Sequence, residues 1–146
     1  MSLYARALRY LARREYSRME LEKKLSDCEY AVDEIKHVLD KLEQQNFLSD
    51  ERAAEQMVHV RGRKYGSKRL RYELQMKGIA EHIIDDTIKN FKQVEFSSAY
   101  ALWNKKFGTA PSSSGERNQQ IRYLLGKGFP FEVVSKVLDD SLEMDN

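Results

Sequence analysis

The sequence has almost no cysteine, since Cys28 is the only one among 146 residues. A single thiol forms no intramolecular disulfide and builds no zinc site, and it fits a reducing compartment. The three histidines, His37, His59 and His82, lack the helical spacing of a pair of metal ligands. We therefore expect no bound metal, and we predict a cytoplasmic protein.

Long apolar runs are also lacking. No stretch of the sequence approaches the roughly 20 apolar residues that a membrane-spanning helix needs. Residues 1–16 interleave basic and polar side chains with apolar ones, so they lack the apolar region of a signal peptide. We expect no contact with a membrane.

The residue patterns of enzymes are missing as well. The chain has no glycine-rich loop of the kind that cradles phosphate groups. The paired acids Asp85-Asp86 and Asp139-Asp140 stand next to each other within helical patterns, where adjacent side chains point apart and cannot share a proton. We therefore expect no catalytic residues, no cofactor and no enzymatic activity.

Charge is abundant and distributed in bands. Charged residues make up 33% of the chain, yet the net charge is only +2. Residues 28–56 hold eight acids and three bases, residues 57–77 hold seven bases and one acid, and residues 131–146 hold five acids and one base. A banded charge distribution can orient a charged partner, so the middle band is the first candidate for a binding site.

Two basic patches stand out. The main patch consists of Arg61, Arg63, Lys64, Lys68, Arg69, Arg71 and Lys77, and a smaller one of Arg13, Arg14 and Arg18. One interpretation of such a patch is a solvated helix surface with weak ion pairs. The other is a surface that binds an anionic partner, because the guanidinium fork fits phosphates and carboxylates alike. Tyr65 and Tyr72 within the main patch either pack against it or stack on nucleic-acid bases.

Apolar residues recur at helical spacing throughout, and no segment shows the alternation of a strand, so we predict an all-α fold of about nine helices. Expected boundaries are a capping box from Ser17 to Glu20, stops at Asn46 and Gly78, and a cap at Ser49. The first five helices are expected over 3–14, around Leu21 and Leu25, over 31–45, after Ser49, and around Leu70 and Leu74. The last four are expected from Ile79 to Phe91, over 96–107, around Ile121 and Leu124, and from Pro130. Pro130 is expected in the first turn of the last helix.

The pattern of apolar residues and glycines repeats. A shift of 50 places Leu74 on Leu124 and Gly78 on Gly128, whereas Glu29 stands at the corresponding position of the first copy. Three copies of a three-helix unit explain this period, with predicted limits of 1–48, 49–94 and 95–146. Because each copy mainly contacts its neighbours, we expect an elongated, curved array.

Three segments carry a resemblance to a known family: ALRYLARREYSRMELEKKL (7–25), FLSDERAAEQMVHVRGRKYGSKRLRYELQMKGI (47–79), and the third copy with KKFG and RNQQIRYLLGKGF. Together they resemble the RecX family over nearly the whole chain. The resemblance implies three tandem three-helix repeats and a non-enzymatic regulator of DNA repair, recombination and the SOS response. It further implies binding to the RecA recombinase filament on single-stranded DNA, with inhibition or modulation of RecA activity.

The partners implied by the resemblance are the RecA filament and single-stranded DNA, contacted directly or through RecA, by a chain that we expect to be a monomer. The main basic patch then meets DNA phosphates or an acidic face of RecA. The alternative is a stand-alone nucleic-acid-binding helical module, against which the net charge of +2 counts. A helical scaffold unrelated to RecX is a third interpretation.

Overall fold

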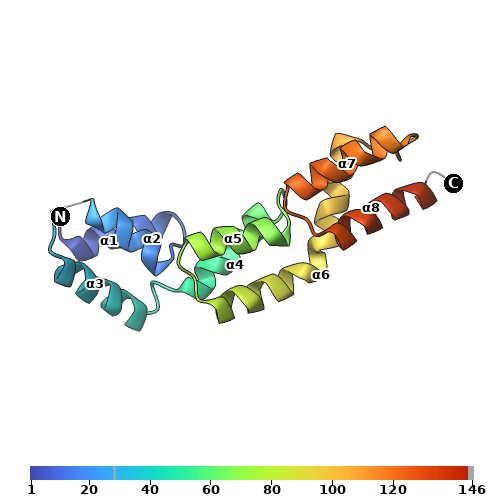
Figure 1. Cartoon of the computed structure of the whole chain (residues 1–146). Coiled ribbons are helices and arrows are strands. Elements are labelled where there is room, and N and C mark those ends of the chain that lie inside the picture. The colour runs from blue at the N-terminus through green and yellow to red at the C-terminus, as the bar shows by residue number, and fades with distance from the viewer. Residues whose placement is uncertain (28, 145–146) are drawn as a thin grey trace. The chain divides into compact units, whose positions relative to one another are not determined.

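The computed structural model describes residues 1–27 and 29–144, so Cys28 lies outside the described residues. Within these residues the chain forms eight α-helices and no strand, which confirms the all-α class (Figure 1). The helices are α1 (Leu3–Arg13), α2 (Arg18–Ser26), α3 (Val32–Gln44), α4 (Asp50–Arg61), α5 (Ser67–Met76), α6 (Glu81–Lys106), α7 (Ser114–Gly126) and α8 (Phe131–Met144). None of them is long and apolar enough to cross a membrane, as far as the described residues go.

The prediction of separate sixth and seventh helices was wrong. Helix α6 is continuous over 26 residues and includes the segment between Phe91 and Phe96 where a break was expected. That segment contains no proline or glycine to end a helix. Buried side chains also follow one another at helical spacing along α6, namely Ile88, Phe91, Glu95, Ala99 and Trp103. A continuous buried stripe favours one helix over two.

Most local boundary signals are confirmed. Ser17 Oγ accepts a hydrogen bond from the Glu20 N–H at 3.1 Å, and Glu20 Oε1 accepts one from the Ser17 N–H at 3.0 Å, which completes the capping box. Asn46 ends α3 with a φ of 63°, and Gly78 follows α5 with a φ of 74°. Pro130 is a correction, because it lies just before α8 rather than in its first turn.

The contacts between residues divide the chain into two compact units. The first unit comprises Met1–Gln56 with Leu74–Ile84, and the second comprises Met57–Glu73 with Asp85–Asn146. Neither unit coincides with one predicted repeat, so the limits 1–48, 49–94 and 95–146 stay a prediction. The elongated, curved arrangement also stays a prediction.

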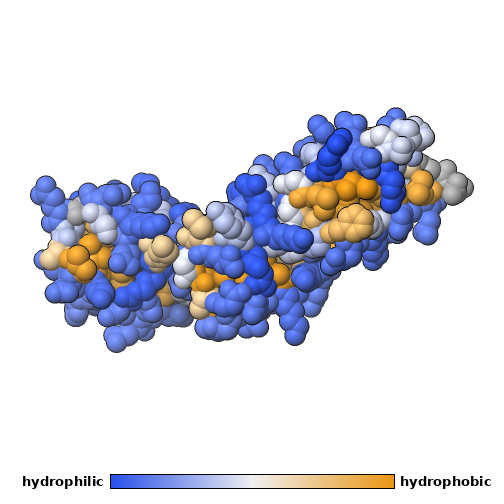
Figure 2. All heavy atoms as spheres, in the orientation of Figure 1, coloured by the Kyte–Doolittle hydropathy of each residue, from blue (hydrophilic) through white to orange (hydrophobic). Residues whose placement is uncertain are grey.

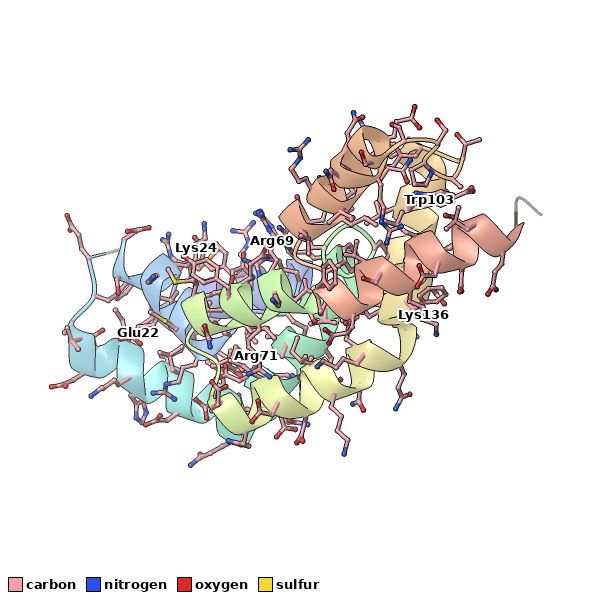
Figure 3. The ribbon with its side chains drawn as sticks, turned by 45° about the vertical axis from the view of Figure 1, so that its right-hand side comes forward. Glu22, Lys24, Arg69, Arg71, Trp103 and Lys136 are labelled. Carbon is pink, nitrogen blue, oxygen red and sulfur yellow. The ribbon has the colours of Figure 1, made fainter. Side chains whose placement is uncertain are left out.

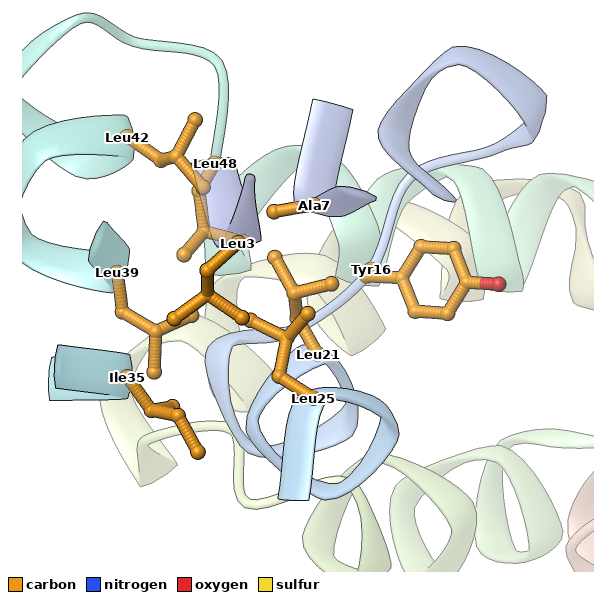
Figure 4. Packing of buried hydrophobic residues seen from close by; sticks show 9 residues of the cluster. All are labelled: Leu3, Ala7, Tyr16, Leu21, Leu25, Ile35, Leu39, Leu42 and Leu48. Carbon is orange, nitrogen blue, oxygen red and sulfur yellow. The ribbon is translucent and has the colours of Figure 1, made fainter. Parts of the chain in front are cut away.

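The core of the first unit lies between α1, α2 and α3 (Figure 4). Each of these helices contributes leucines or isoleucine at helical spacing, and burying one such side chain stabilises the fold by about 1.5–3 kcal/mol. The buried cluster is Leu3, Ala7, Tyr16, Leu21, Leu25, Ile35, Leu39, Leu42 and Leu48.

The second unit has its own core, formed by α6, α7 and α8. The buried cluster is Ala99, Trp103, Leu124, Phe129, Val134, Val137 and Leu138. Trp103 is 2% exposed, and its indole Nε1 donates a hydrogen bond of 2.8 Å to Gln120 Oε1. Trp103 is therefore a packing residue of this core. Outside the cores, most of the face drawn in Figure 2 is hydrophilic.

Candidate interaction surface

Three bases of the main patch are open to solvent. Arg63 and Lys64 lie in the turn after α4, and Lys68 lies in the first turn of α5. All three side chains are exposed, and within residues 1–27 and 29–144 none of them forms an ion pair. Their charges are therefore available to an anionic partner.

Two other bases of the patch share one carboxylate. Arg61 Nη2 lies 2.9 Å from Glu73 Oε2, and Arg69 Nε lies 3.0 Å from the same oxygen. Burial alone raises the pKa of Glu73, but the hydrogen bonds and charges of the two arginines outweigh it and hold that pKa below the usual 4.5. These three side chains carry a net charge of only +1, so the sequence overstates the charge that the patch presents.

The same two arginines also cover the ring of Tyr65. The Cζ of Arg61 lies 4.6 Å and the Cζ of Arg69 lies 4.3 Å from the ring centroid, and Lys127 Nζ lies 5.5 Å away. Cations at these distances are attracted to the ring. The surroundings of Tyr65 favour packing over base stacking. Tyr72, in contrast, is 60% exposed.

The last two bases of the main patch are paired with acids. Arg71 Nη2 contacts Asp85 Oδ1 at 2.9 Å. Figure 3 shows Arg69 and Arg71 on opposite sides of α5, as expected for residues two positions apart on a helix. Lys77 belongs to the first unit, where its Nζ contacts Glu20 Oε2 at 3.2 Å. Arg69 and Arg71 therefore do not share one face of α5, and Lys77 is held by an acid of the first unit.

The smaller patch is mostly compensated. Arg14 Nη2 lies 3.2 Å from Glu20 Oε2, and the Arg14 guanidinium lies 3.6 Å above the centre of the Tyr16 ring. Arg18 Nη1 contacts Asp40 Oδ1 at 2.8 Å and also pairs with Glu43. Arg13 alone of the three is exposed with no ion pair among the described residues.

An open groove runs along α2, but its charges balance. Three bases, which are Arg14, Lys23 and Lys24, and three acids, which are Glu20, Glu22 and Asp27, line the groove. It therefore has no preference for an ion of one sign. The lining residues are Arg14, Tyr16, Met19, Glu20, Glu22, Lys23, Lys24, Ser26 and Asp27. Over the described part of the chain, no group of three or more histidines, cysteines or acids is arranged to hold a metal ion.

Sequence reasoning missed a contact between turns in the second unit. The Lys127-Gly128 turn accepts two backbone hydrogen bonds from the start of α5, namely from the Gly66 N–H to the Lys127 carbonyl at 2.8 Å and from the Lys68 N–H to the Gly128 carbonyl at 3.0 Å. The Ser67 N–H between them donates to the buried carboxylate of Glu95 at 2.6 Å. Three consecutive N–H groups at the start of α5, those of Gly66, Ser67 and Lys68, thereby have acceptors.

The first unit contains a comparable contact at the equivalent turn. Ser17 Oγ, at the start of α2, donates a hydrogen bond of 2.8 Å to the Lys77 carbonyl, while Lys77 Nζ pairs with Glu20. Both contacts join the start of a short helix to a Lys-Gly turn, and the two turns are 50 residues apart. The Lys-Gly pair that repeats at residues 77–78 and 127–128 was the sequence signal for these contacts. The contact in the first unit gives Lys77 a structural role.

Helical units that recur along a chain, each with a Lys-Gly turn that binds the start of a short helix, define a helical-repeat protein. Family models described as the first, second and third three-helix domains of RecX match residues 4–42, 49–88 and 93–138. The chain belongs to the RecX family.

Relatives and solved structures agree with this assignment. The chain is 41% identical to "Regulatory protein RecX" of Ralstonia pickettii (strain 12J), covering 99% of this chain and 91% of the relative. It is 34% identical to the protein of the same name from Neisseria meningitidis serogroup B, covering 99% and 96%. The crystal structure of RecX from Lactobacillus salivarius has the same fold, with a TM-score of 0.83 at 23% identity over 97% of this chain and 95% of that one.

Proposed function

We propose that this protein binds the RecA filament on single-stranded DNA and inhibits or modulates the recombinase and ATPase activity of RecA in DNA repair and recombination. The observation that carries this proposal is the match of all three RecX domains, in order, along one chain. The protein acts without catalysis of its own, so any effect on ATP turnover by RecA is indirect. It works as a monomer in the cytoplasm.

The main basic patch provides the contact with DNA phosphates or with an acidic face of RecA. Arg63, Lys64 and Lys68 contribute most, because their charges are exposed and uncompensated in the described structure. If each contacts one phosphate of a single strand, the log–log slope of affinity against salt concentration is about −2. The paired bases Arg61, Arg69, Arg71 and Lys77 contribute less, because acidic side chains compensate their charges.

Regulation of a filament follows from contacts at several points. A chain of three repeats can contact more than one RecA subunit, so weak single contacts add up to strong binding. Binding within the groove of the filament and capping of its growing end both reduce RecA activity.

Co-sedimentation with RecA filaments tests the proposal. The triple variant Arg63→Gln/Lys64→Gln/Lys68→Gln removes the three open charges, and we expect it to need several-fold more protein to saturate filaments than the wild type. The filaments are assembled on single-stranded DNA with a non-hydrolysable ATP analogue.

The matched control removes three other exposed charges from the second unit, in the variant Lys89→Gln/Lys92→Gln/Lys105→Gln. It should bind filaments like the wild type. Equal binding by both triple variants would refute the role of the patch, and absence of wild-type protein from the filament pellet would refute the proposed function.

The alternative function is a stand-alone nucleic-acid-binding module. The open bases Arg63, Lys64 and Lys68 favour it, whereas the net charge of +2 counts against it. Tight binding to bare DNA at physiological salt, unchanged by RecA, would establish this alternative.

A further inference from the structure

Helix α1 presents a face made of arginine. Arg6, Arg9 and Arg13 lie within roughly 60° of one another around the helix axis, given about 100° per residue. They leave the helix on a side different from that of Leu3 and Ala7, which point into the core (Figure 4). We call these three residues the arginine ridge.

No acid compensates the ridge. Residues 1–14 contain four arginines and no acidic residue. Arg9 and Arg13 are exposed, and the contact that Arg9 makes is a weak one of 3.9 Å to the sulfur of Met1. The Nε of Arg6 is shielded from solvent and has no hydrogen-bond partner. Within the described residues, none of the three arginines forms an ion pair.

This lack of partners does not reflect a shortage of acids in the first unit. Residues 28–56 contain eight acids, and nearby arginines do find carboxylates: Arg14 pairs with Glu20 at 3.2 Å and Arg52 with Glu15 at 3.1 Å. The ridge is also unfavourable for the isolated helix, because like charges repel at this spacing and Arg6 lies near the positive end of the helix dipole. An anionic ligand would relieve both effects.

We propose that the arginine ridge of α1 is a binding site for the phosphate backbone of nucleic acid. The guanidinium fork of arginine matches the oxygens of a phosphate group. The rise from Arg6 to Arg13 is about 10 Å along the helix axis, which lets long side chains reach successive phosphates of one strand.

The composition of this face favours nucleic acid over an acidic protein. Protein interfaces are centred on buried apolar or aromatic side chains. Ala5 and Ala12 flank the ridge, and none of the large apolar side chains of α1 is exposed in the described structure. A face with charge but no apolar anchor suits the electrostatic contacts that position nucleic-acid backbones.

The proposed site goes beyond regulation of RecA, because it requires only the first unit and nucleic acid. It also uses none of the open bases of the main basic patch, Arg63, Lys64 and Lys68, which belong to the second unit. Its main test, the binding of nucleic acid alone, therefore contains no RecA, so failure of this proposal and failure of the proposed function are distinguishable.

Fluorescence anisotropy with a labelled oligothymidine and with a duplex of the same length, over a series of salt concentrations, tests the site. The variant Arg6→Gln/Arg9→Gln/Arg13→Gln should bind more weakly, and its log–log salt slope on the single strand should be shallower by about 2. The duplex arm shows whether the ridge discriminates between the two forms, and a shallower slope on either supports the site.

The control variant Lys36→Gln/Lys41→Gln/Arg52→Gln removes the same charge from the acidic band of the first unit. It should keep the wild-type slope. Because Arg6 is half-buried, the double variant Arg9→Gln/Arg13→Gln serves if the triple variant does not fold, with an expected slope change of about 1.4.

Three results would overturn the proposal. One is wild-type protein that does not bind either oligonucleotide at low salt. Another is a ridge variant whose slope equals that of the wild type or of the control. The third is a ridge variant with unchanged DNA binding but weaker binding to RecA without DNA, which would assign the ridge to an acidic protein surface.

Discussion

Adding a single methyl group at Gly66 should strongly lower the free energy of unfolding. A Cβ atom at Gly66 would lie 2.4 Å from the nitrogen of Phe129 and 2.5 Å from the carbonyl carbon and oxygen of Gly128. These are main-chain atoms, which cannot rotate away as a flexible side chain can. In the variant Gly66→Ala the start of α5 must therefore move away from the Lys127-Gly128 turn.

The cost follows from the contacts that such a movement breaks. The hydrogen bonds from Gly66 to Lys127 and from Lys68 to Gly128 contribute about 1 kcal/mol each. Overpacking of a close contact adds about 1–3 kcal/mol. We expect Gly66→Ala to lower the free energy of unfolding of the second unit by about 3 kcal/mol.

Urea unfolding followed by the fluorescence of Trp103 measures this change, because Trp103 is the only tryptophan of the chain and is buried in the second unit. Gly126→Ala is the matched control: apart from its chain neighbours and the backbone of its own helix, nothing lies within 4 Å of its added Cβ, and alanine stabilises a helix relative to glycine by about 0.5–1 kcal/mol. A Gly66→Ala variant within about 0.5 kcal/mol of the wild type would refute the role of the close contact.

Three further predictions concern single side chains. Glu95→Ala leaves the Ser67 N–H without its acceptor and should cost about 2 kcal/mol in the same urea assay, whereas Glu95→Gln keeps an acceptor and should cost less. The pKa of Glu73 is raised by burial but lowered further by its two arginines, so its stabilising contribution is complete above the usual value of 4.5 and is lost as the pH falls through the lower folded-state pKa. The melting temperature of Glu73→Gln should therefore fall less steeply than that of the wild type below pH 4.5, and parallel curves would contradict this assignment. Ser17→Ala removes both the cap of α2 and the hydrogen bond to Lys77 and should cost about 1–2 kcal/mol by circular dichroism in urea; a loss below about 0.5 kcal/mol would contradict the double role.

Much of the fold was predictable because its signals are local. The capping box at Ser17 needs only four consecutive residues, and the left-handed conformations at Asn46 and Gly78 follow from residue types that tolerate positive φ. The helical spacing of leucines and isoleucines also predicted helices around Leu21 and Leu25 and over 31–45, which the structure shows as α2 and α3.

The continuity of α6 was not predictable in the same way. Glu95 interrupts the apolar pattern at the point where a break between two helices was expected. Its carboxylate is buried because it accepts a hydrogen bond from Ser67, 28 residues earlier in the chain. A pattern within one segment cannot reveal a partner at that separation.

Sequence located the bases of the main patch but not their partners. Glu73 is close enough in sequence to suggest a pair with Arg69, but the pair between Arg71 and Asp85 joins two different helices. Charge reversal at Arg69 or Arg71 would break these pairs as well as any contact with a partner. Exposed bases such as Lys64 therefore give the cleaner functional test.

The most direct test of regulation is the hydrolysis of ATP by RecA on single-stranded DNA, with this protein added at concentrations below that of RecA. We expect the rate to fall progressively at a small fraction of the RecA concentration, because one chain affects many subunits of a filament. An unchanged rate at equal concentrations, with the helical circular dichroism spectrum intact, would contradict the proposed function.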